Sequence, residues 1–359
     1  MARVFFGFIV FFLLLALGVW LKFGGGHRFS DVNTDPVFEA DVLEPVFAYD
    51  QPIGDIAIAA DGTLFFSVHP AARTDDNQVL RIEDGIALPF PDGATQQQVF
   101  GSVSAISTDA LGRLWVVDHG NFGFANPQLL AFDQTTGERV FALTFDSALA
   151  PRGSMLQEIV VTADGNYVFI ADTSLWRETP ALLLVNVADE SAERILNDHP
   201  AFVSQQWQLE SDSGNLTLMG GLLSIMPGID ALSISPDNRW LYQASMSHDG
   251  LFRTSLDRLG RAPLKPERYS DKPLTDALAV AAGGNVYVTD PEHGSVLQID
   301  GRRRITTLVQ SSKLRWPSAL ALGPDDFLYV GDSALPLVIM KDASEVDATA
   351  PYRIFRFRP

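Results

Sequence analysis

The feature that most constrains the fold is a pattern that recurs between residues 56 and 332. In each copy a short apolar run leads into a turn containing Gly, Asn or Asp, and a second apolar or aromatic run follows, as in Ile56–Ile58, Asp61-Gly62 and Leu64–Phe66. The turns of the six copies, about 40 to 75 residues apart, are centred on Gly62, Gly112, Gly165, Asn238, Gly284 and Asp326. Such intervals are typical of four-stranded propeller blades. A β-sandwich with chance hairpins would not repeat six times in the same order, so we predict an all-β, six-bladed β-propeller.

The repeat also predicts where each blade begins. The six innermost strands are expected near residues 56–60, 105–108, 159–162, 231–235, 277–281 and 319–323. The longest interval indicates an insertion around Phe202 to Leu223, which we expect to form an outer strand pair and a loop. A ring must join its two chain ends, and the candidate outer strands are Phe38–Tyr49 and Tyr352–Phe357. We therefore predict one propeller domain over residues 27–359.

The N-terminal segment Val4–Leu21 is almost uninterrupted apolar sequence, flanked by a basic residue on each side. At 1.5 Å per residue it would span roughly 27 Å as a helix, close to the thickness of a bilayer core. An uncleaved membrane anchor is favoured, with Trp20 at the membrane interface. A cleaved signal peptide and a soluble hydrophobic arm are the alternatives. Residues 1–26 are thus read as an anchor or signal segment ending in a flexible tether, Gly24–Gly26.

Charge and cysteine content exclude several functions. Lys and Arg total 26 against 44 Asp and Glu, which gives a formal net charge of −18. Such a chain repels phosphate backbones, so we expect no nucleic-acid partner and instead a cation, either a divalent metal or an amine. The chain has no cysteine, which excludes disulfides, thiolate catalysis and iron–sulfur clusters. No glycine-rich phosphate loop joins a strand to a helix, so nucleotide binding has no support.

Polar residues gather where the chemistry of a propeller is expected. In each blade the start of the inner strand lies beside the end of the next strand, because the two form an antiparallel hairpin. The starts of the inner strands carry Gly54-Asp55, Ser104, Gln157-Glu158, Asp230, Asp276 and Ser318. The ends of the second strands carry His69, Asp118-His119, Asp172-Thr173, Ser245–His248, Asp290–His293 and Asp332-Ser333. Acidic and histidine side chains converging on one channel opening are what a ligand or metal site needs.

A structural explanation competes with this functional one. An Asp that ends a strand often caps the next turn by accepting backbone N–H groups, and this applies to Asp118, Asp172, Asp290 and Asp332. The capping explanation applies less to Asp230 and Asp276. These residues precede apolar strands that line the channel, where an unpaired carboxylate would be costly. We therefore expect Asp230 and Asp276 to point into the channel on the same face as His248 and His293, with Gln157 nearby. The expected ligand-binding residues are Gln157, Glu158, His248, His293, Ser318, Asp118 and His119.

Several segments resemble the yellow / major royal jelly protein family. They are Leu156–Val161 with Tyr167–Asp172, Ile229–Asp237 with Trp240–Tyr242 and Leu251–Arg253, and Leu314–Pro317 with Leu328–Val330. Where the family usually has Trp-Pro-Asp, this chain has Ser318. The resemblance covers most of residues 45–340 and implies a six-bladed propeller. Family members are typically secreted; some insect members bind biogenic amines in the central channel, and others are linked to dopachrome pigment chemistry. The insect members carry disulfides, which this chain cannot form.

A more distant resemblance is to the gluconolactonase / senescence-marker propellers. These hold a divalent metal with a Glu, two Asn and an Asp at the starts of inner strands. The matching positions imply a metal set of Asp55, Gln157, Asp230 and Asp276, in which Asp276 alone keeps the family's residue type and Asp55 fits only with a one-residue shift. Oxygen ligands of this kind suit Ca²⁺ or Mg²⁺, although the departures weaken the case for lactonase activity.

Three functions follow from the sequence. The first is a membrane-anchored or secreted propeller of the cell envelope, facing the periplasm or exterior, whose acidic channel binds a small cationic or polyhydroxy molecule. The second is a metal-dependent lactone hydrolase in which Asp230 or Asp276 acts as ligand or base. The third is a scaffold that binds another protein. The ligand and the oligomeric state are left open.

Overall fold

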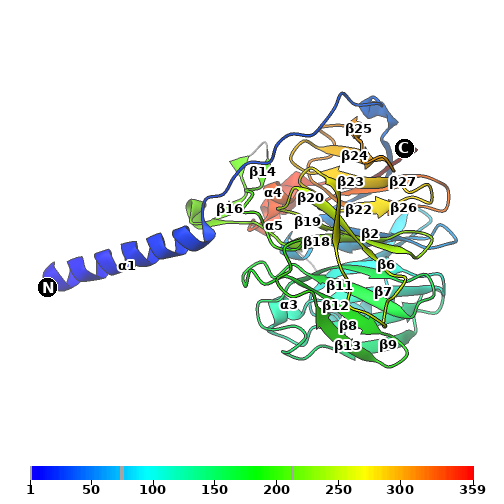
Figure 1. Ribbon diagram of the computed structural model, residues 1–359, viewed down its shortest axis with the longest axis horizontal. Helices are drawn as coiled ribbons and strands as arrows, with labels where there is room; N and C mark the ends of the chain where they lie inside the picture. Colours follow the sequence, from blue (N-terminus) through cyan, green and yellow to red (C-terminus); the bar gives the residue numbers. More distant parts are fainter. Residues whose placement is uncertain (1, 73–76, 212–213) are drawn as a thin grey trace.

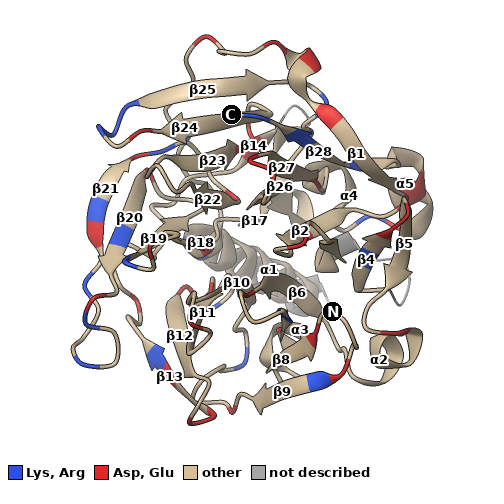
Figure 2. Ribbon diagram, turned by 90° about the vertical axis from the view of Figure 1, so that its right-hand side faces the viewer, with Lys and Arg blue, Asp and Glu red and all other residues tan. Residues whose placement is uncertain are grey.

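Six antiparallel sheets of four strands surround a central channel in the computed structural model, which describes residues 2–72, 77–211 and 214–359 (Figures 1 and 2). The prediction of a six-bladed propeller is confirmed. Neighbouring inner strands contact one another all round the ring, in the order β2, β6, β10, β18, β22, β26 and back to β2. Each blade is numbered below along the chain, and its strands are given from the channel outward.

Blades one to three follow one another without interruption. Their strands are β2 Ile53–Ile58, β3 Leu64–Val68, β4 Val79–Glu83 and β5 Ile86–Pro89; β6 Val103–Thr108, β7 Arg113–Asp118, β8 Gln128–Asp133 and β9 Arg139–Thr144; and β10 Leu156–Val161, β11 Tyr167–Asp172, β12 Ala181–Asn186 and β13 Ser191–Ile195.

Blades four to six complete the ring. Their strands are β18 Ile229–Ile234, β19 Trp240–Ser245, β20 Gly250–Ser255 and β21 Glu267–Asp271; β22 Leu278–Val280, β23 Val286–Asp290, β24 Ser295–Ile299 and β25 Ile305–Gln310; and β26 Pro317–Leu322, β27 Leu328–Asp332, β28 Tyr352–Phe357 and β1 Glu44–Tyr49.

The two ends of the chain close the ring in blade six. The N-terminal strand β1 pairs antiparallel with the C-terminal strand β28, with Glu44 opposite Arg356 and Tyr49 opposite Tyr352. Arg356 also bonds the Glu44 carboxylate at 3.1 Å. The outer strands expected from the sequence are therefore both present, and three strands from one end of the chain hold one strand from the other.

The inner strands begin two or three residues earlier than expected in five blades. The sequence rule starts each strand at the first of its alternating apolar residues, but the observed strands also include the polar residues before them. A register shift marks this point in each of the five: between Ile53 and Ile56, Val103 and Ala105, Leu156 and Glu158, Ile229 and Ala231, and Pro317 and Ala319. These are β-bulges, in which an extra residue breaks the alternation that the sequence rule relies on.

Apolar side chains fill the space between blades. Trp115, for example, is fully buried between blades two and three with Ile159 and Val168, and its indole N–H donates to Asp109 at 2.8 Å. The short helices lie in the connections between strands and are α2 Gly93–Gln98, α3 Gly120–Gly123, α4 Leu335–Val338 and α5 Ala343–Thr349; the 3₁₀ turns are Ala40–Val42, Pro70–Ala72 and Met219–Gly221.

The insertion between blades three and four is not an outer strand pair, so that expectation is wrong. It forms two small hairpins, β14 Glu210–Ser211 with β15 Gly214–Asn215 and β16 Thr217–Leu218 with β17 Leu223–Ser224. These lie over one end of the channel, because Leu209, Leu216 and Ile225 bury their side chains there instead of against the outside of a blade. Residues 212 and 213 lie outside the described part of the chain.

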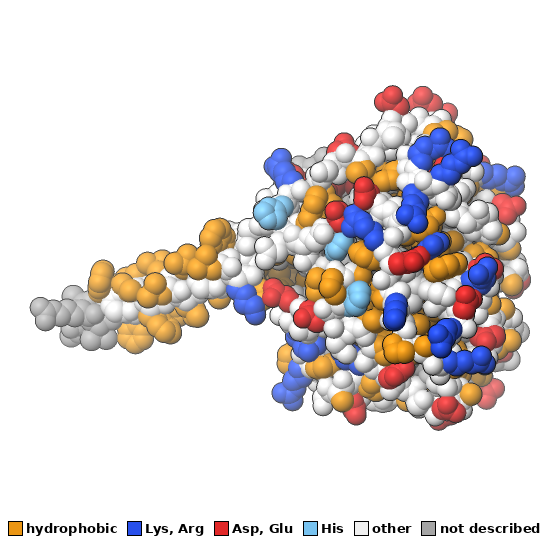
Figure 3. All heavy atoms as spheres, in the orientation of Figure 1, with side chains coloured by type: hydrophobic (Ala, Val, Ile, Leu, Met, Phe, Trp, Pro, Cys, Tyr) orange, Lys and Arg blue, Asp and Glu red, His pale blue; other side chains and the backbone are white. Residues whose placement is uncertain are grey.

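The apolar N-terminal segment forms one helix, α1 Ala2–Phe23, which extends away from the ring (Figures 1 and 3). Figure 2, which views the ring from the side away from α1, shows the helix behind the ring and passing obliquely across its centre, so α1 leaves the ring on the far side of the channel. Phe5–Phe23 is long and apolar enough to cross a membrane, a property that signal sequences share. We call the side from which α1 emerges the helix face and the opposite side, which carries the turns at Gly62, Gly112 and Gly165, the turn face.

The segment after α1 is bound to the insertion. The Gly25 carbonyl accepts from Ser224 Oγ at 2.7 Å, and the His27 N–H donates to the Gln206 carbonyl at 2.7 Å. The Phe29 ring packs on Trp207 with 3.8 Å between ring centres. The glycines that the sequence suggested as a flexible tether are therefore part of a short bonded strap in this structure.

Two truncations separate the helix from the ring. Because α1 has no buried face against the blades, deleting residues 1–26 should leave a soluble, folded propeller with a melting temperature within a few degrees of the full chain. Deleting residues 1–50 also removes β1, so the open blade six should abolish cooperative thermal unfolding. Circular dichroism melts and size-exclusion chromatography distinguish the two; aggregation of residues 27–359 would show that α1 belongs to the core.

Candidate functional site

The β-bulges turn polar side chains toward the channel axis. In the inner strands of blades two, three, four and six, the extra residue is Ser104, Gln157, Asp230 and Ser318, respectively. In blade one the shift spans Gly54 and Asp55. A bulge reorients the residue it inserts and is common beside active sites. The same local irregularity in five blades therefore produces a polar ring at the helix-face end of the channel.

These residues enclose a cavity of about 20 Å³, enough for about one water molecule. It is lined by Gly54, Asp55, His69, Ser104, Gln157, Glu158, Asp230, Asp276 and Ser318. The structure thus brings together six residues chosen from the sequence: Asp55, Gln157, Glu158, Asp230, Asp276 and Ser318. His69 completes the wall; it was among the residues at the strand ends but was not selected as a ligand.

Four of the lining side chains bond across the junctions between blades. The Asp55 carboxylate of blade one accepts the Ile106 N–H of blade two at 2.9 Å. Ser104 Oγ of blade two donates to the Leu156 carbonyl of blade three at 2.5 Å. Asp276 Oδ2, beside blade five, accepts Trp316 Nε1 at 2.6 Å, and Ser318 Oγ of blade six donates to the Ile53 carbonyl at 3.1 Å.

The remaining two junctions contain unsatisfied oxygen atoms. Gln157 Oε1 and Asp230 Oδ1 are buried and have no hydrogen-bond partner among the described residues. Gln157 belongs to blade three and Asp230 to blade four. At the junctions between blades three and four and between blades four and five, these two oxygens have no hydrogen-bond donor in the described part of the chain, whereas the other four junctions each have a side-chain hydrogen bond. Buried acceptors without partners are rare and costly, which makes this side of the cavity the place where a donor or a cation would be stabilised.

Burial controls the protonation of the four acids. Desolvation raises the pKa of Asp55 and of Asp276 to about 7. It also raises the pKa of Glu158 well above its usual range, with further contributions from the negative charges of Asp55, Asp230 and Asp276. The pKa of Asp230 is raised by burial and then by the charge of Asp276. Four carboxyl groups this close cannot all ionise at neutral pH without a compensating cation.

One buried basic residue lies near the acids. Lys272 is 2% exposed, and its Nζ donates to the Pro273 carbonyl at 3.0 Å. Burial lowers the pKa of Lys272 to about 7, against the opposing charges of Asp249, Asp290 and Asp230. Sequence reasoning did not select Lys272, because a lysine in a polar segment is usually exposed.

An apolar cluster closes the helix-face end of the channel. Leu209, Leu216 and Ile225 of the insertion pack with Met246, Leu274, Trp316 and Leu335 from the blades. Trp316 belongs to this cluster and also donates to Asp276, so the apolar plug and the acidic cavity are in direct contact. Exclusion of water by the plug explains the strong desolvation of the acids beneath it.

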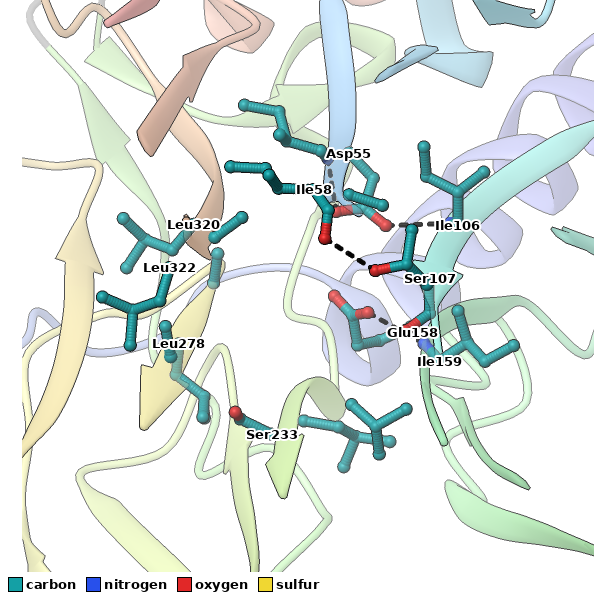
Figure 4. A pocket seen from close by; sticks show the side chains of 18 of the residues that line it. Asp55, Ile58, Ile106, Ser107, Glu158, Ile159, Ser233, Leu278, Leu320 and Leu322 are labelled. Atoms are coloured by element: carbon teal, nitrogen blue, oxygen red, sulfur yellow. Dashed lines mark hydrogen bonds between the residues drawn. The ribbon is translucent and has the colours of Figure 1, made fainter. Parts of the chain in front are cut away.

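The channel is open toward the turn face. A pocket of about 190 Å³ there is lined by the middle and end of the inner strands, with apolar side chains such as Ile58, Leu278 and Leu322. Asp55 and Glu158 line both this pocket and the inner cavity. Figure 4 shows their carboxylates in the pocket, bonded to the Ile106 and Ile159 N–H groups. These two acids therefore connect the open pocket with the enclosed cavity.

The acids at the ends of the second strands are structural. Asp118 accepts the N–H groups of Gly101, Ser102 and Gly120 at 2.6 to 2.9 Å. Asp172 accepts the N–H groups of Met155 and Ser174 at 2.9 and 3.0 Å and also binds Arg194. Asp332 accepts the Trp316 N–H at 2.8 Å and also binds Arg315. The capping explanation is therefore the one that the structure supports for these positions, and Asp118 lies away from the cavity.

The three selected histidines also lie outside the cavity wall. His119 contacts Ser102 Oγ at 3.1 Å and accepts the Phe122 N–H. His248 accepts the Gly250 N–H, and burial and then the nearby Lys272 lower its pKa to about 4. His293 bonds Asp290 at 2.8 Å, which raises the pKa of His293 to about 9, and it borders surface pockets. Antiparallel pairing predicts how far along the channel these histidines lie. It does not predict how far they lie from the channel axis, and the expectation that they face the channel is therefore wrong.

The donor set does not fit the four-ligand metal site that the distant resemblance implies. Both Asp55 oxygens accept backbone N–H groups, from Ile56 and Ile106. Within residues 2–72, 77–211 and 214–359, no group of three or more His, Cys, Asp or Glu side chains is placed to hold one metal ion. The open oxygens of Gln157 and Asp230 suit a cation, but two acceptors are fewer than Ca²⁺ takes from such sites.

The fold and the acidic channel define a class, six-bladed propellers with a polar site on their axis. The sequence profile of the family described as "Major royal jelly protein" matches residues 101–343. The chain belongs to the major royal jelly protein family. A search of curated protein sequences finds no match.

Solved structures with the same fold are similar in shape but distant in sequence. A gluconolactonase from Xanthomonas campestris is 15% identical, with 94% of this chain and 99% of that chain covered and a TM-score of 0.58. Regucalcin, a calcium-binding protein from Agrobacterium tumefaciens, is 15% identical, with coverage of 90% and 95% and a TM-score of 0.59. A luciferin-regenerating enzyme is 13% identical, with coverage of 88% and 95% and a TM-score of 0.59. At these identities the similarity establishes the fold.

Replacing Asp276 should change how stability depends on pH. A carboxyl whose folded pKa is raised to about 7 adds stability below its unfolded pKa of about 4, and that stability is lost as the pH rises through about 7. Asp276→Asn removes the ionisation and keeps an acceptor for Trp316. We expect the variant to exceed wild type in unfolding free energy by about 1–3 kcal/mol at pH 8, and by much less at pH 5. Denaturant titrations at both pH values measure this.

The control for that experiment is Glu138→Gln, which neutralises an exposed acid on blade two. It should leave the free energy of unfolding unchanged at both pH values. If Asp276→Asn were destabilised equally at pH 5 and pH 8, the carboxylate would be needed as a structural partner of Trp316, and burial of its charge would not matter.

Proposed function

We propose that this protein binds a small organic cation in its acidic channel, and that it does so on the outer side of a membrane or in the space beyond it. The observation that carries the proposal is the cluster of four carboxyl groups around one cavity, of which Asp230 is buried and Asp55, Glu158 and Asp276 are half-buried. Desolvation raises the pKa of all four, and neighbouring negative charges add to the effect. A bound cation would stabilise their ionised forms, for which the protein itself supplies one nearby positive charge, that of Lys272 beside Asp230.

The shape of the channel supports an ammonium ion with a slender apolar body. Most residues around the open pocket are aliphatic, polar atoms make up much of the surface it exposes, and its inner end is formed by Asp55 and Glu158. A ligand entering from the turn face would place its apolar part among Ile58, Leu278 and Leu322 and its charged end against the two acids. Approach from the helix face is blocked by the apolar plug.

The first step of recognition is electrostatic. Glu158 uses one oxygen to accept the Ile159 N–H, at 2.8 Å, which leaves the other available to a ligand. Beyond it, Gln157 Oε1 and Asp230 Oδ1 offer acceptors that lack partners in the protein. An ammonium group has three donors, so one cation can satisfy the ligand-facing oxygen of Glu158 and both open acceptors.

A metal-dependent lactonase is the second candidate. The open oxygens of Gln157 and Asp230 favour a cation of some kind, and two similar structures are a gluconolactonase and a calcium-binding protein. A Ca²⁺ or Mg²⁺ ion bound here would have, among the residues that the structure describes, only the open oxygens of Gln157 and Asp230 as buried ligands without partners, which makes this candidate the weaker of the two. Native mass spectrometry of the protein with and without chelator, together with hydrolysis of a sugar lactone, tests this function separately from amine binding.

The location follows from α1. An apolar helix of 22 residues with Trp20 and Lys22 at its end suits an uncleaved anchor, and cleavage would instead yield a secreted propeller. Cleavage places the ring outside the cytoplasm, and so does the anchor when the end of α1 near Lys22 faces outward. Sequencing the N-terminus of the protein purified from membranes and from medium decides between them.

Amine binding can be tested with matched probes. Isothermal titration with 2-phenylethylamine should show binding, whereas its neutral counterpart 2-phenylethanol should bind much more weakly. Glu158→Gln should weaken amine affinity at least about tenfold, because a charged hydrogen bond is worth about 1.5–3 kcal/mol, and Glu138→Gln should have no effect. Equal binding of the amine and the alcohol, or no effect of Glu158→Gln, would contradict the proposal.

Binding should strengthen as the pH rises from about 6 to about 8. Asp55 and Asp276 have pKa values raised to about 7, and a cation binds better to ionised acids, so binding releases protons. Affinity should increase by up to about tenfold per pH unit below pH 7 for each proton released. Titrations in two buffers of different ionisation enthalpy count those protons directly; a pH-independent affinity would show that these acids do not contact the ligand.

A further inference from the structure

Five large hydrophobic side chains are exposed on the helix face of the ring. They are Phe124, Trp176, Met219, Leu337 and Met340, with exposures from 38% to 79%. They come from separate connections: the β7–β8 and β11–β12 loops, the insertion, and the β27–β28 connection. Segments distant in the sequence therefore place aromatic residues, Met and Leu on the same side of the molecule.

The other exposed large hydrophobic residues of the described ring are located elsewhere. Val46, Ile86, Leu88 and Val140 lie on outer strands, and Val37 lies on the segment leading to β1. On the turn-face loops, Leu111 is the one such residue in the described part of the chain. The helix face therefore exposes five large hydrophobic side chains and the turn-face loops expose one, within the described part of the chain.

A membrane crossed by α1 would lie next to the helix face. The helix has 22 residues, which gives a length of about 33 Å, and the hydrocarbon core of a bilayer is about 30 Å thick. A helix spanning the core would therefore end at the membrane surface close to Trp20 and Phe23. The bonds of Gly25 to Ser224 and of His27 to Gln206 then leave little slack between that surface and the insertion.

We propose that the helix face of the propeller rests on the lipid headgroup layer, with Phe124, Trp176, Met219, Leu337 and Met340 in contact with the bilayer. Aromatic side chains are favoured at this depth, where apolar and polar surroundings meet. The helix leaves the ring from this face and extends away from it, as Figures 1 and 2 show, so a membrane crossed by α1 lies on this side of the ring. The open pocket faces the aqueous compartment. This inference rests on the proposed membrane anchoring, and does not depend on which ligand binds.

The overall charge defines the lipid partner. With a formal net charge of −18, the protein is repelled by anionic lipid surfaces. The contact is therefore with the apolar part of the interface and is expected with zwitterionic lipid. Nanodiscs of phosphatidylcholine are the appropriate probe, because electrostatic attraction cannot produce the contact there.

The absence of cysteine permits single-site labelling of the full chain. Nitroxide labels at Phe124→Cys, Met219→Cys and Met340→Cys report on the helix face, Leu111→Cys is the matched exposed control on the turn face, and Leu14→Cys reports on α1. Power-saturation measurements compare accessibility to oxygen, which is enriched in lipid, with accessibility to a water-soluble nickel complex. Melting temperatures equal to that of wild type confirm that each labelled protein is folded.

We expect the three helix-face labels to become severalfold less accessible to nickel than the Leu111 label, and more accessible to oxygen. If the helix-face labels are as accessible to nickel as the Leu111 label while the Leu14 label is buried in lipid, the proposed docking is wrong and the membrane anchoring is supported. If the Leu14 label is also accessible to nickel, both the anchor and the docking fail. If the helix-face labels are shielded from nickel and oxygen alike and couple to labels on another molecule, the face is an interface between two copies, which also overturns the proposal.

Discussion

The pairing of β1 with β28 is the interaction on which the rest of the structure depends. It joins the two ends of the described ring in blade six, and only a closed ring holds six inner strands around one axis. The polar contacts at the channel depend on that closure, since Ser318 of blade six bonds the carbonyl of Ile53 in blade one, and Asp55 of blade one bonds blade two. The residues of the candidate site therefore also connect the blades.

This double role separates the lining residues into two groups. Asp55, Ser104, Asp276 and Ser318 have protein partners across four junctions, so changing them affects the ring as well as any ligand. Gln157 and Asp230 keep buried oxygens without partners, and a fold would gain stability by replacing them with apolar residues. These polar atoms are hard to explain by stability, which supports the proposed ligand site between blades three, four and five.

Much of the fold could be predicted because repeats report topology directly. Six copies of one hairpin fixed the number of blades, and two unused β-rich ends identified β1 and β28. The strand starts were misplaced because bulges at Ser104, Gln157, Asp230 and Ser318 interrupt the alternation of apolar residues. The same interruption carried the useful signal, since these polar positions are the ones that line the cavity.

The limits of prediction at the site have a geometric cause. Antiparallel pairing determines the height of a residue along the channel, so Asp230, Asp276 and Gln157 were placed together correctly. It does not determine how far a loop swings outward, and His248 and His293 lie in loops beyond the ends of their strands. Lys272 was missed because its burial is produced by tertiary packing, including a cation–π contact with Phe29 from the N-terminal strap.

The insertion gives the channel its direction, which the repeat alone could not do. A ring of six similar blades has two openings, and nothing in the repeated pattern makes one of them the entrance. Here Leu209, Leu216 and Ile225 close the opening on the helix face, and the same segment binds the strap that follows α1 through Ser224 and Gln206. One segment therefore links the closed end of the channel to the membrane-spanning candidate helix, so that any exchange of ligand through the open pocket takes place on the side away from α1.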